Sequence, residues 1–285
     1  MAKVDVKTQI KIMFEGLNNQ SALNSFPERG LLKDKLSIIV NNIKKNKNVN
    51  NTVFIDKLIL SHFATASIEM WHRSLHSFLI SASLTKASPI WSSVSGYYSS
   101  HYSVRAFAHL LGYFQLHLAK RIIQIEINGS QYLCNVIQKN GNDREHKFYW
   151  KIVKESEYFA NDPFFKINDE STSQSDSGHR NLANYLDHIN NFPNFEVLSI
   201  DELKNRIKKI SRIEYSDAPI PNTDSFPDLN NVQLTAYHRM VRFRSFLDNV
   251  LINKNRFWMK HRDPIWCSKI LNYQVTNPEY TTLYK

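Results

Sequence analysis

Glycine and cysteine are scarce in this chain. Seven glycines occur among 285 residues, and the two cysteines are Cys134 and Cys267. Two cysteines so far apart in sequence exclude a disulfide framework and a zinc site built from several cysteines. Because glycine destabilises helix interiors, its scarcity is typical of a protein that is rich in long helices.

Long apolar runs are also missing. No uninterrupted stretch approaches the roughly 18 apolar residues that a membrane-spanning helix needs. The residues from Met1 to Asp5 are not followed by the apolar core of a signal peptide. We therefore expect a protein that remains in the cytoplasm and has no membrane partner.

The residues that are present indicate a folded, basic protein. Hydrophobic residues make up 42% of the chain and aromatic residues 12%, which is enough for a substantial core. The formal net charge is +10, so RNA or another nucleic acid is the expected charged partner. The alternative is a solvated basic surface that binds no anion specifically.

Apolar residues recur at helical spacing over most of the chain. The segments predicted to be helical are Val6 to Leu17, Leu31 to Lys45, Val53 to Ser83, Pro89 to Phe114, Lys147 to Phe159, Asp201 to Ser211 and Val232 to His261. The short break from Leu84 to Pro89 predicts that the third and fourth of these helices form an antiparallel hairpin.

One part of the chain alternates with the period of a β-strand. Residues Arg121 to Ile127 and Gln131 to Gln138 alternate apolar and polar side chains, and Asn128-Gly129 between them is a strong signal for a two-residue turn. The sequence therefore predicts a β-hairpin near 121–138, inserted between helices.

Two segments together resemble the HEPN superfamily of helical domains. The first is SGYYSSHYSVRAFAHLL, residues 95–111, which is similar to the family's helix of small and aromatic residues; the second is RNLANY, residues 180–185, which is similar to its arginine motif. The resemblance implies a mainly α fold, a helical bundle of HEPN type with an inserted β-hairpin. It implies an N-terminal helical extension at 1–50, a HEPN-like core at 51–190, and a basic C-terminal helical region at 191–285 that packs on the core.

The resemblance also implies a site for metal-independent RNA cleavage. In ribonuclease members an arginine is followed directly by a polar residue. Four to six residues, counted from the one after the arginine, separate the arginine from a histidine. Arg180 and Asn181 match the first two positions, Tyr185 stands where the histidine would first come, and His188 lies one residue beyond the usual spacing. A group that titrates near neutrality is needed to move the proton of the 2′-hydroxyl, and a cation is needed to hold the phosphate. The alternative is that Arg180 pairs with a carboxylate and Tyr185 packs on the bundle.

A second match to the motif lies near the C-terminus. Arg256 and His261 have the required spacing, although Phe257 replaces the polar neighbour and such matches arise by chance in a basic chain. Residues five apart project in different directions from a straight helix. The resemblance implies that a family-type active site needs a second protomer, as in ribonuclease members, so a homodimer or another protein partner is expected.

Further residues are predicted to support the site or to bind nucleic acid. Arg105 and His109 lie one turn apart on the central helix and either line a cleft or are buried structural groups. The predicted nucleic-acid-binding residues are Lys204, Arg206, Lys208, Lys209, Arg242 and Arg244. Nearby aromatic residues could stack on unpaired bases.

Metal chemistry is not expected. Glu69, His72 and His76 fall on one helical face, but a di-iron bundle needs a second Glu-x-x-His, which the sequence lacks. We predict no metal and no cofactor.

The expected function is that of an RNA-interacting toxin or antiviral-defence effector with metal-independent endoribonuclease activity. The alternative is a catalytically inactive HEPN-like scaffold or a binding subunit of a larger complex.

Overall fold

The computed structural model describes most of the N-terminal half of the chain and two helices near the C-terminus. The described residues are 4–18, 29–45, 51–85, 88–116, 120–138, 145–159, 165, 231–251 and 255–262. They divide between two compact units. The first unit comprises Met1–Met70, Val104–Ala160 and Phe246–Arg262, and the second comprises Trp71–Ser103, Asn161–Ser245 and Asp263–Lys285.

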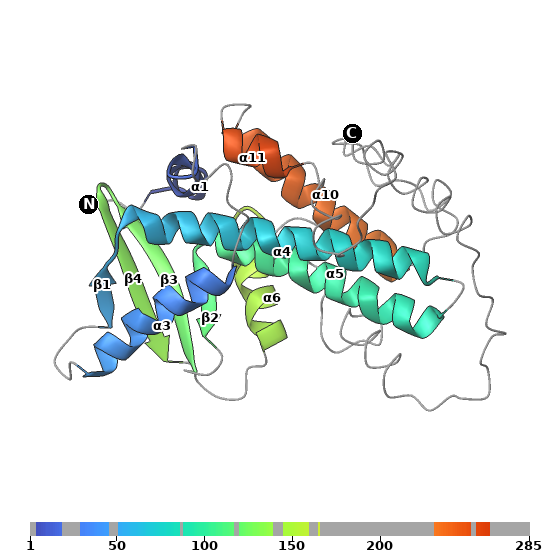
Figure 1. Cartoon of the computed structure of the whole chain (residues 1–285), viewed down its shortest axis with the longest axis horizontal. Helices are drawn as coiled ribbons and strands as arrows, with labels where there is room; N and C mark the ends of the chain where they lie inside the picture. Colours follow the sequence, from blue (N-terminus) through green and yellow to red (C-terminus); the bar gives the residue numbers. More distant parts are fainter. Residues whose placement is uncertain are drawn as a thin grey trace. The chain divides into compact units, whose positions relative to one another are not determined.

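The described residues are mostly helical, with one small antiparallel sheet (Figure 1). The helices are α1 (Val6–Glu15), α3 (Arg29–Lys45), α4 (Lys57–Ser83), α5 (Pro89–Leu110), α6 (Glu145–Glu155), α10 (Asn231–Leu251) and α11 (Arg256–His261). The strands are β1 (Thr52–Phe54), β2 (Tyr113–Leu116), β3 (Arg121–Asn128) and β4 (Gln131–Gln138). None of these helices combines the length and the apolar character needed to cross a membrane.

The sheet lies in the first unit and has the strand order β1-β4-β3-β2. The predicted hairpin is confirmed: β3 and β4 pair in antiparallel register from Arg121 opposite Gln138 to Asn128 opposite Gln131. The turn falls one residue later than predicted, at Gly129 and Ser130, because Asn128 still pairs in the ladder. Gly129 has a φ of 61°, which glycine adopts without strain.

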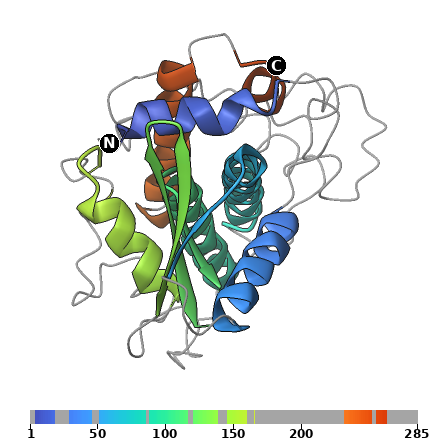
Figure 2. The same cartoon turned by 90° about the vertical axis from the view of Figure 1, so that its left-hand side faces the viewer.

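One face of the sheet forms the core of this unit. Ile123, Ile125 and Cys134 are buried on this face. The ring of Phe114 on β2 meets the ring of Phe63 on α4 edge-on, with the centroids 6.3 Å apart. Near the hairpin turn, the N–H of Val4 donates to the Ile127 carbonyl at 3.0 Å. This hydrogen bond attaches the chain that leads into α1 to the end of the sheet (Figure 2).

The sequence prediction that a helix begins at Val53 is wrong. Val53 and Phe54 belong to β1, which pairs with β4, and α4 begins only at Lys57. Asp56 accounts for this start, because its carboxylate accepts a hydrogen bond from the N–H of Ile59 at 3.0 Å and so caps the first turn. The hairpin is therefore part of a four-stranded sheet, not an isolated insertion.

The prediction that the next helix continues to Phe114 is also wrong. α5 ends at Leu110, and Tyr113 and Phe114 enter β2. Gly112 makes this change of direction possible, since its φ is 85° and its carbonyl accepts from the N–H of Ile125 at 2.8 Å. A Cβ at this position would come within 3.2 Å of the Ile125 Cβ.

Replacing Gly112 with alanine is expected to lower the free energy of unfolding by about 1 to 2 kcal/mol, because an L-residue is strained at this φ. Urea denaturation of the full chain measures the change. Gly129→Asn is the matched control, since asparagine tolerates a positive φ at an exposed turn and should change stability little. Equal stability of Gly112→Ala and the wild type would contradict this account of the turn.

The helical hairpin of α4 and α5 is confirmed, and serine side chains set its register. The Oγ atoms of Ser74 and Ser99 each donate to the other residue's carbonyl, at 2.7 and 2.8 Å. Ser81 and Ser92 repeat the arrangement one heptad along, at 2.6 and 2.8 Å. Small side chains at seven-residue intervals let the two backbones approach closely, and each buried hydroxyl has a partner.

In the second unit α10 packs against this hairpin. The indole N–H of Trp71 donates to the Met240 carbonyl at 3.1 Å. The side-chain amide of Gln233 reaches both the Ser81 carbonyl and the Ser92 hydroxyl, at 3.0 and 2.9 Å. These contacts tie the middle and the start of α10 to the two helices of the hairpin.

The prediction of one continuous helix from Val232 to His261 is wrong. α10 ends at Leu251, and α11 begins at Arg256 after a residue of extended backbone, Asn255. The side chain of Asn255 accepts from the N–H of Trp258 at 2.9 Å, which is the arrangement of a helix N-cap. A capping residue at this point starts a new helix.

Candidate functional site

The predicted arginine motif falls outside the described residues. This is true of Arg180, Asn181, Tyr185 and His188. It is also true of the predicted nucleic-acid-binding residues Lys204, Arg206, Lys208 and Lys209. Their roles stay predictions.

The second match to the motif, from Arg256 to His261, is the helix α11. Two hydrogen bonds attach the start of this helix to α1 and to the residues that follow α1. The Nδ2 of Asn255 donates to the Phe14 carbonyl at 2.9 Å, and the N–H of Arg256 donates to Oδ1 of Asn18 at 3.0 Å. The backbone of α11 is therefore held in place at the residue that begins the motif.

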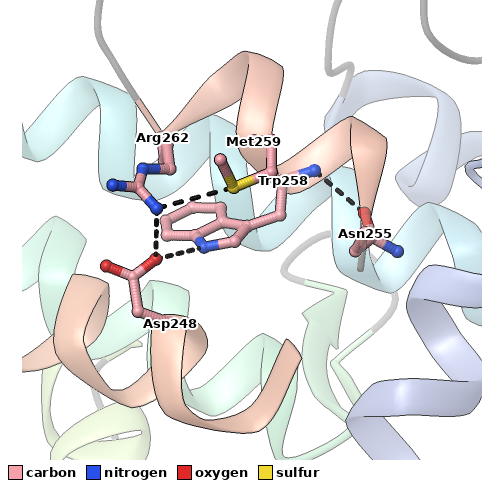
Figure 3. Close-up of polar contacts among 5 residues, drawn as sticks. All are labelled: Asp248, Asn255, Trp258, Met259 and Arg262. Carbon is pink, nitrogen blue, oxygen red and sulfur yellow. Dashed lines mark hydrogen bonds and ion pairs between the residues drawn. The ribbon is translucent and has the colours of Figure 1, made fainter. Parts of the chain in front are cut away.

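A shared carboxylate fixes the other end of α11 to α10 (Figure 3). Oδ1 of Asp248 accepts from the indole N–H of Trp258 at 2.7 Å and from Arg262 at 3.4 Å. The same Arg262 nitrogen lies 3.5 Å from the sulfur of Met259. Arg262 and Asp248 form an ion pair of partly exposed side chains, so this guanidinium is engaged within the protein.

The two members of this motif have opposite environments. The Arg256 side chain is exposed, whereas His261 is buried, with its ring centroid 4.3 Å from that of Phe257. Burial, and secondarily the charge of Lys260, lowers the pKa of His261 to about 4. The imidazole is therefore neutral at pH 7 and lies in the interior, away from the solvent that the guanidinium faces.

The predicted supporting residues Arg105 and His109 lie together in the first unit, around the ring of Tyr149 on α6. The Arg105 guanidinium carbon is 5.1 Å from the centroid of this ring, within the range of a cation–π contact. The His109 ring meets it edge-on at 5.7 Å. The Tyr149 hydroxyl accepts from the backbone N–H of Gln115 at 3.0 Å, and so covers a donor on β2, the edge strand.

Neighbouring groups fix the orientation of His109. Its Nδ1 is 2.9 Å from the carbonyl of Tyr113, which requires the proton on Nδ1. Its ring stacks on Phe114 with the centroids 5.1 Å apart. His109 and Tyr149 are fully buried and Arg105 is 9% exposed, so the cluster packs the end of α5 against the sheet and α6.

The predicted nucleic-acid-binding residues Arg242 and Arg244 lie on α10, and both are half-buried. The neighbouring Arg239 is fully buried; it donates to the Ser100 hydroxyl, and its guanidinium carbon is 6.0 Å from the ring centroid of Phe165. Arg239 was not among the residues predicted to bind nucleic acid. Its place in the helical spacing beside Ala236 and Phe243 is the signal that could have indicated burial.

Metal-ligand chemistry has no geometric basis in the part of the chain that the structure describes. Within it, no three histidine, cysteine, aspartate or glutamate side chains come together to hold a metal ion. Glu69 and His72 are buried on α4, and burial lowers the pKa of the half-buried His76. Burial also raises the pKa of the Cys134 thiol to about 12, so this cysteine is not a nucleophile at neutral pH.

Comparison with known proteins adds no relative. No protein-family model, no curated protein and no solved structure matches this chain.

Proposed function

We propose that this chain is an HEPN-like RNA-interacting protein, a toxin or antiviral-defence effector that cleaves RNA without a metal ion. The observation that carries the proposal is the arginine motif at 180–185, together with the net charge of +10. The helix that contains the other segment of the resemblance is α5, which packs as a central helix against α4 and α10. A packed helix of this kind supports a HEPN-like bundle.

In the proposed reaction the 2′-oxygen of a ribose attacks the adjacent phosphorus. A 2′,3′-cyclic phosphate forms, the bond to the 5′-oxygen breaks, and the leaving oxygen takes up a proton. Arg180 holds the phosphate as negative charge develops, and Asn181 orients it. His188 moves the proton, in preference to His261, because the imidazole of His261 is buried and its lowered pKa of about 4 makes it a weak base at neutral pH.

Incubation of the purified full chain with total RNA in EDTA tests this proposal. We expect cleavage products that end in a cyclic phosphate. Arg180→Ala and His188→Ala should each slow cleavage by at least about a hundredfold. Lys33→Ala, which removes an exposed positive charge on α3, is the control and should cleave normally.

Intact RNA with the wild-type protein would contradict the nuclease proposal. Normal cleavage by His188→Ala, combined with lost cleavage in a folded His261→Gln variant, would assign the proton transfer to the motif on α11. Either result can be read from the same gel and the same mass analysis of the fragment ends.

The second candidate is a catalytically inactive HEPN-like scaffold or binding subunit. The burial of His261 favours it, and so does Tyr185 at the position where the family motif has histidine. This candidate predicts that Arg180→Ala abolishes a cellular phenotype although the wild type yields no cleavage product. A homodimer or a further protein partner is compatible with both candidates.

A further inference from the structure

The sheet of the first unit has two edge strands, β2 and β1 (Figure 1), and side chains cover the edge of β2. The Tyr113 carbonyl of β2 binds Nδ1 of His109 at 2.9 Å, and the N–H of Gln115 donates to the Tyr149 hydroxyl at 3.0 Å. An uncovered edge strand offers unpaired N–H and C=O groups to a further strand. His109 and Tyr149 therefore block such pairing at β2.

The edge of β1 is open at Thr52 and Phe54. The residues on either side bind β4, Asn51 through its carbonyl at 2.7 Å and Ile55 through its N–H at 2.9 Å. Because alternate residues of an antiparallel strand direct these groups to the same side, the N–H and C=O groups of Thr52 and Phe54 point away from β4. No hydrogen bond of the described residues engages these four groups.

This open edge is accessible and fixed in position. Thr52 is exposed, and the Phe54 side chain is 73% exposed. The Thr52 hydroxyl donates to Oδ1 of Asn135 on β4 at 2.8 Å, and Nδ2 of Asn135 donates to Oε2 of Glu126 on β3 at 3.2 Å. These side chains attach β1 to the rest of the sheet, so the edge is already in the conformation that pairs with another strand.

The number of open groups favours a partner strand that is itself already ordered. An incoming strand gains four main-chain hydrogen bonds from Thr52 and Phe54, however long it is. Fixing one residue of a flexible peptide costs about as much free energy as one such bond contributes. A flexible peptide therefore gains little at this edge, whereas a strand that is held in a sheet does not incur this cost.

The β1 strand of a second copy meets this requirement. In an antiparallel pairing about a two-fold axis at Val53, Thr52 of each copy lies opposite Phe54 of the other, and each such pair exchanges two hydrogen bonds. All the open groups of both strands are then paired. The residues from Asn51 to Ile55 carry no charge, so two copies of a chain of net charge +10 place no like charges opposite each other along this strand.

We infer that β1 is a self-association edge: two copies of this chain pair their β1 strands in antiparallel register about Val53 and join their sheets. This inference goes beyond the proposed function and does not depend on RNA cleavage. β1 has three residues, which cover less than the roughly 800 Å² that each partner of a stable complex buries. The dimer is therefore expected to dissociate on dilution.

Sedimentation velocity of the full chain over a wide range of protein concentrations tests the inference. The wild type should show a reversible equilibrium between monomer and dimer. Thr52→Lys/Phe54→Lys places lysine opposite lysine at both pairs, whereas Thr52→Lys/Phe54→Glu places lysine opposite glutamate. The first variant should dimerise more weakly than the wild type and at least about tenfold more weakly than the second. Both positions are exposed, so both variants are expected to fold.

Glu155→Lys is the control for net charge. It raises the charge of the chain by the same amount as Thr52→Lys/Phe54→Lys, but at an exposed position on α6, whose Tyr149 covers the opposite edge of the sheet. It should dimerise like the wild type. Urea denaturation of each variant establishes that it is folded.

Two results would overturn the inference. One is a wild type that remains monomeric at every concentration. The other is equal dimerisation of the two double variants, which would mean that the copies meet at a different surface. Weak dimerisation of Thr52→Lys/Phe54→Lys alone, with Glu155→Lys unaffected, supports pairing of the two β1 strands.

Discussion

Replacing Trp71 with alanine is expected to lower the free energy of unfolding by about 3 to 5 kcal/mol, a large share of the stability of a typical domain. The indole is fully buried, donates to the Met240 carbonyl at 3.1 Å and stacks on Phe243 with the centroids 5.7 Å apart. Truncation removes this packing between α4 and α10 and takes the N–H donor from a buried carbonyl. Urea denaturation at neutral pH measures the loss.

Trp91→Ala is the matched control for this prediction. It removes the same side chain from a position that is 60% exposed on α5, so the free energy of unfolding should change by no more than about 0.5 kcal/mol. Similar losses for the two variants would mean that Trp71 does not join the two helices as described.

Acid is expected to destabilise the protein below the pH at which free histidine titrates, and His261 should account for about 2 kcal/mol of the loss at pH 5. Burial lowers the pKa of His261 in the folded chain to about 4, below the ordinary histidine value of 6.5. At pH 7 the imidazole is mostly neutral in both states and its effect on stability is small. As the pH falls from about 6.5 to 4, the unfolded state binds the proton first, and stability is lost; below about 4 the loss is complete.

Denaturation of the wild type and of His261→Gln at pH 7.5 and pH 5 measures this effect. The glutamine variant does not titrate, so its loss between the two pH values should be smaller than that of the wild type by about 2 kcal/mol. Burial also lowers the pKa of His62 and His76, so part of the loss of stability in acid remains in both proteins. Identical pH dependence of the two proteins would show that His261 is not buried in solution.

The elements with strong local signals could be predicted from the sequence. Alternation and a glycine that accepts a positive φ identified β3 and β4, and helical spacing identified α4 and α5. The short strands β1 and β2 were missed because three or four residues are too few to show a period. Both adjoin long helices whose apolar pattern extends into them, so only pairing with β4 and β3 distinguishes them from helix.

The candidate site was less predictable, because its contacts join distant parts of the chain. The spacing of Arg105 and His109 places them on one helical face, but nothing local indicates that both contact the ring of Tyr149 on α6. The motif from Arg256 to His261 has the correct spacing, yet the burial of His261 depends on tertiary packing. Arg180 and His188 lie outside the described residues, and the cleavage assay tests their predicted roles.

The paired serines of α4 and α5 also restrict how this hairpin can move within the second unit. Sliding one helix along the other by a single turn would separate the Ser74–Ser99 and Ser81–Ser92 pairs together and break all four of their hydroxyl–carbonyl hydrogen bonds at once. The two helices therefore have one favourable axial alignment. Any rearrangement that alters this hairpin should bend the helices or separate them, and translation along their common axis is disfavoured.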